Sequence, residues 1–495
     1  MRRAALGLVL AAAAALRFPT LDTQSLWLDE AVTARLLRMD PGAMLRAIPD
    51  SESTPPLYYV LAWLWTQLFG TGEVGMRSLS ALLGTATVAL VWALGRRIGG
   101  GDRAAFAAAA LVAVNPMLVW FSQEARAYAL VALLTTLSAL LWLRALERPQ
   151  AAGRLLAWGA AAALALATHY YAAFLVAPQA LWLALRVPGW RERGALLALP
   201  GLTAAALAPL ALGQRENDTA AFITASELLT RLAQVPKQFL VGYDAPLEPL
   251  LVGASALAVL AGLAGLAALL RGGVEATETE RGECAALAGL AAAALVLPAL
   301  AAVAGEDHLI TRNVVFVLPL ALALAGAGLA AVARWAPRLA AVALAAACIA
   351  GIVAVAGVAR SDRLQRDDWR AAVRALGPID QPRLIVSSAG SFVALQYYLP
   401  GLRQATPPAF TTAEIDQLTL PVRPPGGPAR PPRPADPVPP APGFALVGRT
   451  EAQTFTVLRW AAPAAVAVPV VPAVGLDGEP AALFTAVPEA DATDR

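Results

Sequence analysis

Charged residues are scarce in this sequence, and lysine is almost absent. Only 15% of the 495 residues are charged and 58% are apolar, and Lys237 is the sole lysine among the 38 basic residues. A water-soluble globular domain carries about a quarter charged residues, so a soluble fold is excluded for most of the chain. The net charge is only +3 and the arginines stand at the ends of apolar runs, which excludes a basic patch for nucleic acid.

Cysteine is equally rare, with two residues in the chain. Cys284 and Cys348 lie in or beside apolar segments, so the sequence offers neither a disulfide framework nor a zinc motif. It also shows no dense group of carboxylates that would hold a metal ion. We therefore expect no metal and no other cofactor.

Apolar runs dominate the chain from Ala4 to Val358. Each is about 20 residues long, the length of helix that crosses ~30 Å of hydrocarbon, and short arginine-containing loops separate them. The pattern predicts an α-helical polytopic membrane protein over residues 1–359. Residues 1–20 begin with two arginines, as signal peptides do, but an uncleaved first helix fits the following pattern better.

The arginines also predict the orientation of the helices, because short cytoplasmic loops carry an excess of basic residues. They place the N-terminus inside and the loop of residues 21–55 outside. The apolar segment 56–70 has a run of only about 14 residues, a length typical of re-entrant or interfacial segments. We expect it not to cross fully, which leaves about 11 crossings and puts the C-terminus outside.

The pattern changes after Arg360, where a small α/β domain is predicted over residues 360–460. Helices are expected at 367–376 and 392–398, and strands at 384–387, 444–447 and 455–460. A proline-rich insert, residues 421–442, has too few apolar residues to pack. Residues 461–495 are expected to form a poorly ordered tail.

Two adjacent carboxylates, Asp29 and Glu30, follow the first apolar helix. Trp27 and Leu28 would enter the headgroup boundary of the membrane, which would hold Asp29 where a lipid phosphate meets water. The structural alternative is that both carboxylates only stabilise the N-terminus of an interfacial helix through its dipole.

A second polar cluster joins two apolar helices on the same predicted outer face and contains Glu124, Arg126 and Tyr128. Ionisable residues at membrane depth are costly, so a functional role is the first hypothesis for them. Mutual pairing of Glu124 with Arg126 is the structural alternative.

The two histidines, His169 and His308, also fall on this face, the first beside Tyr170. A single histidine at a helix end is more often a satisfied surface residue. Arg312 stands one turn into an apolar helix and needs an anion there, and a guanidinium binds phosphate through two parallel hydrogen bonds. Together with Tyr58, these residues suit a polyprenyl-phosphate substrate whose headgroup faces the aqueous side.

At these residues the sequence resembles the GT-C superfamily of polytopic glycosyltransferases. Within it, the chain is similar to the bacterial family 39 type, with its dolichyl-phosphate-mannose protein mannosyltransferases and lipid A aminoarabinose transferases. The markers are the Asp29-Glu30 pair with Pro55-Pro56-Leu57-Tyr58-Tyr59, the second motif at residues 122–128, and Asp367-Asp368-Trp369-Arg370 after the last apolar run.

The resemblance implies an inverting transfer of a sugar from a polyprenyl phosphate to a hydroxyl of a glycan, lipid or protein. This would occur among membrane lipids on the outer face of a bacterial cytoplasmic (plasma) membrane. Asp29 would be the general base, with Glu30 beside it. Arg126 and Arg312 would stabilise the charge on the leaving phosphate, and the other implied donor-site residues are Glu124, Tyr128, His169, Tyr170 and Tyr58.

The sequence departs from the family pattern at two motif positions. Thr54 stands where many members have histidine, and Glu124 where the protein-mannosylating relatives have aspartate. These departures leave the acceptor and the sugar open. A transporter or flippase of lipid-linked sugars is the main alternative, although transporters hold their polar residues near the bilayer midplane and show internal repeats. A scaffold role for the exported domain is a third alternative, although so many crossings exceed what an anchor needs.

Overall fold

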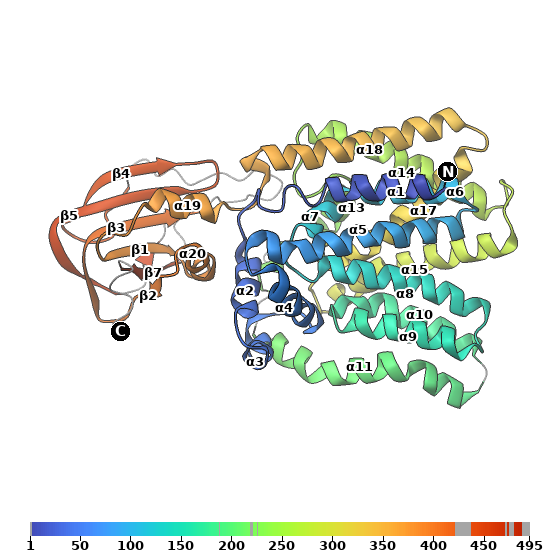
Figure 1. Cartoon of the computed structure of the whole chain (residues 1–495), viewed down its shortest axis with the longest axis horizontal. Coiled ribbons are helices and arrows are strands. Elements are labelled where there is room, and N and C mark those ends of the chain that lie inside the picture. The colour runs from blue at the N-terminus through green and yellow to red at the C-terminus, as the bar shows by residue number, and fades with distance from the viewer. Residues whose placement is uncertain are drawn as a thin grey trace. The chain divides into compact units, whose positions relative to one another are not determined.

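The computed structural model describes residues 2–187, 189–217, 221–224, 226–420, 437–470, 473–474 and 480–487. Its contacts divide the chain into two compact units (Figure 1). The membrane unit comprises Met1–Leu21 and Met39–Gly357, and the α/β unit comprises Asp22–Arg38 and Val358–Arg495. The short segment Asp22–Arg38 therefore groups with the C-terminal part of the chain, although the sequence places it between two apolar helices.

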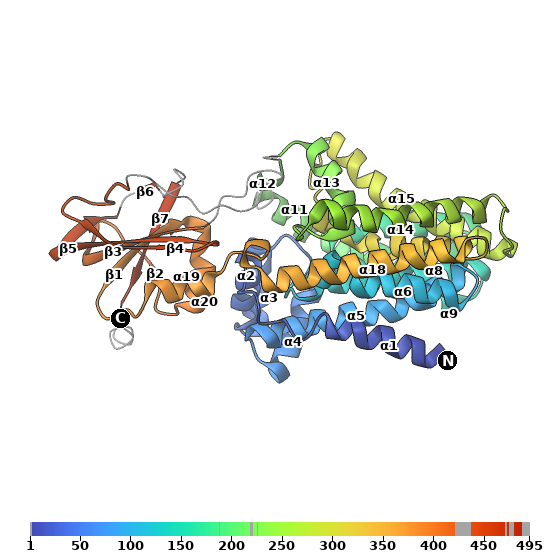
Figure 2. The ribbon, with the colours of Figure 1, turned by 90° about the horizontal axis from the view of Figure 1, so that it is seen from above.

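The described part of the membrane unit is helical throughout. Its longer helices are α1 (Arg2–Ala15), α5 (Glu73–Ile98), α6 (Asp102–Val114), α8 (Tyr128–Glu147), α9 (Ala152–Leu166), α10 (Ala173–Arg186), α11 (Trp190–Glu216), α14 (Glu248–Leu270), α15 (Glu278–Val303), α17 (Leu318–Val332) and α18 (Pro337–Arg360). Shorter elements connect them: α3 (Pro41–Ser51), α4 (Leu57–Phe69), α7 (Pro116–Ser122), the turn η1 (Tyr170–Ala172), α12 (Ala221–Thr224), α13 (Leu228–Val241), α16 (Thr311–Val314) and the turn η2 (Val315–Val317). Two views at right angles show α5, α6 and α8 side by side in this bundle (Figures 1 and 2).

The lengths and hydropathies of these helices confirm the predicted polytopic membrane fold. Among the described residues, seven helices are long and apolar enough to cross a bilayer, and the pair α6 and α7, bent by 59°, makes an eighth candidate. Helices α1, α9 and α10 have 14, 15 and 14 residues, fewer than the roughly 20 of a full span. The predicted number of 11 crossings therefore stays a prediction.

Helix α4 corresponds to the apolar segment expected not to cross fully. It contains 13 residues, which at 1.5 Å per residue extend only about 20 Å. This length is about two thirds of the hydrocarbon thickness.

Small residues allow the long helices to approach closely. A Cβ atom added at Gly265 of α14 would lie 1.9 Å from the carbonyl oxygen of Gly328 on α17, and one added at Gly326 would lie 2.5 Å from the backbone of Ala108 on α6. Inside a bilayer, the hydrophobic effect does not drive helices together, because lipid tails are as apolar as the side chains. Membrane helices therefore associate through close packing of this kind. The abundance of alanine and glycine in these segments therefore has a packing role.

Charged side chains tie several helices together at one end of the bundle. Arg97, in the last turn of α5, pairs with Glu147 of α8 and with Glu283 of α15, and Arg154 of α9 also pairs with Glu147. These residues belong to the arginine-rich loops that the sequence predicts to be cytoplasmic. Because α8 runs from Tyr128 to Glu147, the start of this helix marks the opposite end.

The α/β unit contains a sheet with strand order β2-β7-β1-β3-β5-β4, and a short β6 pairs with β7. The pair β1–β3 is parallel and the other pairs are antiparallel. Its strands are β1 (Arg383–Ser388), β2 (Arg403–Gln404), β3 (Ala409–Thr419), β4 (Ala445–Glu451), β5 (Thr456–Pro469), β6 (Ala473–Val474) and β7 (Pro480–Ala486). Its helices are α2 (Leu28–Leu37), α19 (Trp369–Leu376) and α20 (Phe392–Tyr398), with short turns at Asp362–Leu364 and Ala389–Ser391.

The structure confirms the predicted small α/β fold and corrects its C-terminal part. The sequence predicts a poorly ordered tail from residue 461, but β5 continues to Pro469 and β7 pairs with β1 along its length. The cause is burial, since Phe484 of β7 is 1% exposed in the core beside Ile385. Residues 421–436 of the proline-rich insert lie outside the described residues.

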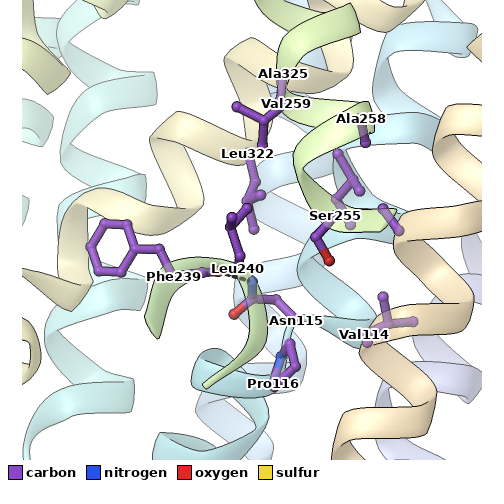
Figure 3. Close-up of a pocket in the computed structure, with 13 residues that line it drawn as sticks. Val114, Asn115, Pro116, Phe239, Leu240, Ser255, Ala258, Val259, Leu322 and Ala325 are labelled. Carbon is purple, nitrogen blue, oxygen red and sulfur yellow. Dashed lines mark hydrogen bonds between the residues drawn. The ribbon is translucent and has the colours of Figure 1, made fainter. Parts of the chain in front are cut away.

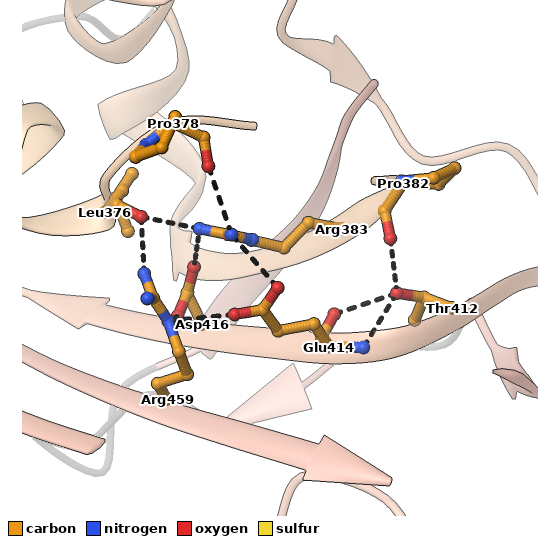
Figure 4. A network of polar contacts seen from close by, with 8 residues as sticks. All are labelled: Leu376, Pro378, Pro382, Arg383, Thr412, Glu414, Asp416 and Arg459. Carbon is orange, nitrogen blue, oxygen red and sulfur yellow. Dashed lines mark hydrogen bonds and ion pairs between the residues drawn. The ribbon is translucent and has the colours of Figure 1, made fainter. Parts of the chain in front are cut away.

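A buried network of charges joins three strands of the sheet to the end of α19 (Figure 4). Arg383 of β1 contacts Glu414 and Asp416 of β3 at 3.0 Å, and Nε of Arg459 on β5 lies 3.0 and 2.9 Å from the same two carboxylates. Both guanidinium groups also donate to the carbonyl oxygen of Leu376, the last residue of α19. Burial raises the pKa of Asp416, against the opposing effect of Arg459 and Arg383.

We expect Asp416→Asn to destabilise the α/β unit by about 3 kcal/mol or more, because it leaves two arginines near the core without one of their carboxylates. Thermal unfolding of the full chain, followed by limited proteolysis of the C-terminal part, measures this loss. Arg449→Gln is the matched control, since Arg449 pairs with Glu451 at a half-exposed position and such pairs contribute about 0–1 kcal/mol. Equal stability of the two variants would contradict a structural role for the network.

Candidate active site

A buried ion pair lies at the end of the membrane unit where α7 and α8 meet. Nη1 of Arg126 is 2.7 Å from Oε1 of Glu52, and the two side chains are 6% and 2% exposed. Burying two charges is costly unless they pair with good geometry. Each of these two side chains therefore depends on the other for its buried position. Sequence reasoning identified Arg126 but missed Glu52, because a single carboxylate in a loop carries no signal of burial.

The segment around Glu52 is held by several hydrogen bonds. The hydroxyl groups of Thr54 and Tyr59 are 3.1 Å apart, and the Gln214 amide at the end of α11 donates to the carbonyl oxygen of Thr54 at 3.3 Å. Tyr170 in turn donates to the side chain of Gln214 at 2.8 Å. Through Gln214, Tyr170 is therefore connected to the segment that contains Glu52.

Several residues predicted from sequence gather around the ion pair. The ring of His169 lies 5.9 Å from that of Tyr128, and Nδ1 of His169 accepts a hydrogen bond from the backbone of Tyr171 at 3.2 Å. Burial, followed by the charges of Arg312 and Arg126, lowers the pKa of His169 to about 3. His169 is therefore neutral at physiological pH, and the charges of both predicted phosphate-binding arginines act on its pKa.

The loop that leads into α16, the short helix containing Arg312, is fixed by a second buried arginine. Arg231 of α13 contacts Asp307 with two parallel hydrogen bonds of 2.8 and 2.5 Å and also donates to the carbonyl oxygen of Leu309 at 2.6 Å. The hydrogen bonds from Arg231 lower the pKa of Asp307. This bidentate contact anchors the segment directly before α16, the helix that contains Arg312.

The second motif, residues 122–128, is anchored by Arg17 from the end of α1. Arg17 is fully buried, and it donates to Ser122 Oγ at 3.1 Å and to the carbonyl oxygens of Ala113 and Val112 at 2.7 and 3.2 Å. These carbonyls lie at the break between α6 and α7, where Pro116 interrupts the helix and removes a backbone donor. The break and Arg17 together place the motif that contains Arg126.

A small cavity lies beside the same break (Figure 3). Its volume is about 40 Å³, and it is lined mainly by apolar side chains of α6, α13, α14, α17 and α18, with Asn115 and Ser255 as polar members. The amide of Asn115 donates to the carbonyl oxygen of Phe239 at 2.8 Å. None of the predicted site residues lines this cavity.

The remaining predicted residues differ in their surroundings. Tyr58 and Glu124 are buried in the membrane unit, at 0% and 1% exposure. Asp29 and Glu30 belong to the α/β unit, in the first turn of α2. The two residues differ in exposure, since Asp29 stays partly exposed whereas Glu30 is fully buried and lies 3.6 Å from Arg366.

Comparison with protein families supports the resemblance inferred from the motifs. The family model described as dolichyl-phosphate-mannose-protein mannosyltransferase matches residues 53–212. This range contains Arg126, His169 and Tyr58 but neither Asp29 nor Arg312. Comparison with curated protein sequences gives no match. The family match confirms the resemblance to these enzymes and the prediction of a glycosyltransferase.

Several solved structures are similar to this chain at low identity. They include ArnT from Cupriavidus metallidurans bound to undecaprenyl phosphate, with 16% identity over 79% of this chain and 84% of ArnT and a TM-score of 0.49. The oligosaccharyltransferase AglB from Archaeoglobus fulgidus has 13% identity over 75% of this chain and 57% of AglB, with a TM-score of 0.46. The arabinosyltransferase EmbB from Mycobacterium smegmatis has 15% identity over 66% of this chain and 30% of EmbB, with a TM-score of 0.41.

We expect Glu52→Gln to destabilise the protein by about 3 kcal/mol or more, because it leaves the buried charge of Arg126 without its carboxylate. Thermal unfolding in detergent measures the loss. Glu306→Gln is the control, since the pair of Glu306 with Arg215 is more than half exposed and its removal should change stability by less than about 1 kcal/mol. A Glu52→Gln protein as stable as this control would show that the pair is dispensable.

His169 makes stability depend on pH in a defined direction. Its pKa of about 3 in the folded protein lies below the value near 6.5 of an unfolded chain, so protons bind first to the unfolded state as the pH falls below about 6.5. Between pH 7 and pH 5 the melting temperature should therefore fall more steeply for the unaltered protein than for His169→Gln. Parallel curves for the two proteins would show that His169 is not kept neutral by the fold.

Proposed function

We propose that this protein transfers a sugar from a polyprenyl-phosphate donor to a hydroxyl acceptor at the outer face of a bacterial plasma membrane. The observation that carries this proposal is the convergence of Arg126, paired with Glu52, with Arg312 and neutral His169 at one end of the helical bundle. The family match over residues 53–212 supports the same reaction class. An anionic lipid headgroup is the ligand that this set of side chains suits.

The two arginines have different roles in the proposed donor site. Glu52 lies 2.7 Å from the guanidinium of Arg126, which fixes the position of this positive charge within the proposed site. Arg312 would bind the phosphate from α16, and Arg231 supports the loop that precedes this helix. Positive charge placed in advance stabilises the negative charge that gathers on the leaving phosphate as the glycosidic bond breaks.

Asp29 is the general base of the proposed reaction. It removes the proton of the acceptor hydroxyl, whose oxygen attacks the anomeric carbon while the polyprenyl phosphate leaves, so the configuration inverts in a single displacement. Glu30 is buried against Arg366, whereas Asp29 is partly exposed and can accept a proton. His169 is a poor competitor for this role, because a group with a pKa near 3 is a weak base at neutral pH.

The proposed orientation follows from the two ends of the bundle. Arg97, Arg154 and their partners lie at the end where α8 finishes, and basic loops are retained on the cytoplasmic side. Arg126 lies directly before α8 begins, at the other end. The donor site would therefore face the outside of the cell, and the α/β unit, which follows α18, would be exported.

A transporter or flippase of lipid-linked sugars remains the second candidate function. Transporters bind substrate near the bilayer midplane, often between repeated halves. In the membrane unit, Arg126 precedes α8 and His169 follows α9, which places both at helix ends. This position favours chemistry at the membrane surface over passage through the bundle.

We expect Asp29→Asn to reduce sugar transfer roughly 100-fold or more, because general-base catalysis contributes about that much or more to such reactions. Membranes containing the protein would be supplied with radiolabelled polyprenyl-phosphate sugars, beginning with mannose, and label leaving the lipid fraction would be measured. Asp22→Asn, which alters an exposed carboxylate of the same segment, should transfer normally. Undiminished transfer by Asp29→Asn would reject Asp29 as the base.

A further inference from the structure

Helix α2, which carries Asp29 and Glu30, is built into the α/β unit. Ala31 of this helix is 1% exposed and belongs to the same hydrophobic core as Trp369 of α19 and Leu395 of α20. The helix also packs along α20. A segment that follows the first apolar helix in sequence is thus folded as part of the C-terminal unit.

Hydrogen bonds fix the start of α2 to the segment that begins α19. Ser25 donates to the carbonyl oxygen of Asp367 at 2.8 Å and accepts from the backbone of Trp369 at 3.0 Å. The backbone of Arg366 donates to the Gln24 side chain at 3.1 Å. The two motifs that the sequence shows more than 300 residues apart therefore form one structural element.

Further contacts fix the same helix at both of its ends. The backbone N–H of Leu26 donates to the hydroxyl of Tyr398 on α20 at 2.7 Å. At the other end, the guanidinium of Arg38 lies 4.5 Å from the ring centre of Tyr397. The helix is therefore held at its N-terminus and at its C-terminus by the same partner helix.

Arg366 lies close to two residues near Asp29 in the sequence, Glu30 and Trp27. Its guanidinium lies 3.6 Å from the carboxylate of Glu30, which is fully buried, and 5.6 Å from the ring centre of Trp27. Successive residues on a helix point about 100° apart, so fixing the direction of Glu30 also fixes the direction in which the Asp29 side chain leaves the helix. Arg366 thereby constrains the first turn of α2, which contains both carboxylates.

We propose that the α/β unit positions Asp29, with Arg366 and Glu30 as positioning residues that act through the first turn of α2. This inference rests on the proposed role of Asp29 as the base. A general base must lie within hydrogen-bond reach of the proton it removes, and a displacement of about 1 Å can cost roughly 100-fold in rate. The unit thus has a task within the reaction and is more than an exported appendage.

The test compares Arg366→Gln with Arg374→Gln, which removes an exposed arginine from the same part of the chain. We expect Arg366→Gln to lower kcat roughly 10- to 100-fold with little change in KM for the polyprenyl-phosphate donor, and Arg366→Lys to restore part of the loss. Hydrogen–deuterium exchange of residues 26–37 should rise in Arg366→Gln while exchange in α5 and α8 stays unchanged. Arg374→Gln should match the unaltered protein in both measurements.

Ser25→Ala provides a second variant that removes only one hydroxyl group from the junction. It should lower kcat in the same direction by a smaller factor and raise exchange in the same residues, and it decides the question if Arg366→Gln fails to fold. Unaltered kcat in both variants, with Asp29→Asn inactive, would overturn the positioning role alone. Full activity of Asp29→Asn would instead remove the proposed base, whatever the exchange data show.

Discussion

Arginine side chains buried among apolar helices impose the strongest constraint on this structure. A guanidinium keeps its charge and its five donors in a low-dielectric environment, so each one must meet acceptors with defined geometry. Arg126 meets Glu52, Arg231 meets Asp307, and Arg17 meets the carbonyls freed at the break of α6 and α7. These contacts fix the loops at one end of the bundle. The candidate donor site consists of side chains in and beside these loops.

The residues proposed for the reaction belong to two compact units of the chain. The membrane unit contains the residues suited to the phosphate of the donor, and the α/β unit contains the carboxylate proposed as base. The proposed base lies on α2, a helix from the first loop of the chain that belongs to the α/β unit. The two carboxylates of the pair differ in exposure, since Glu30 is fully buried near Arg366 whereas Asp29 is partly exposed.

Much of the fold could be predicted because periodic and compositional signals are local. The long apolar runs correspond to helices, and the expected helix at 392–398 and strand at 384–387 correspond to α20 and β1. Strands β3 and β7 escaped prediction. The first is a mixed polar segment whose Asp416 is buried only because Arg383 and Arg459 meet it across the sheet, and the second lies in an Ala/Pro-rich tail that pairs only once β1 is in place.

The sequence by itself determined the membrane class and the resemblance to lipid-dependent glycosyltransferases, and it suggested most of the candidate site residues, because charged residues are scarce among apolar runs. Tertiary structure alone decided which partner each charge has. Glu52 beside Arg126, Arg17 at the helix break and Arg366 beside Glu30 join residues 74, 96 and 336 positions apart. Such pairings depend on which helix ends meet in space. The meeting of helix ends is set by the packing of the whole chain and cannot be read from any short stretch of the sequence.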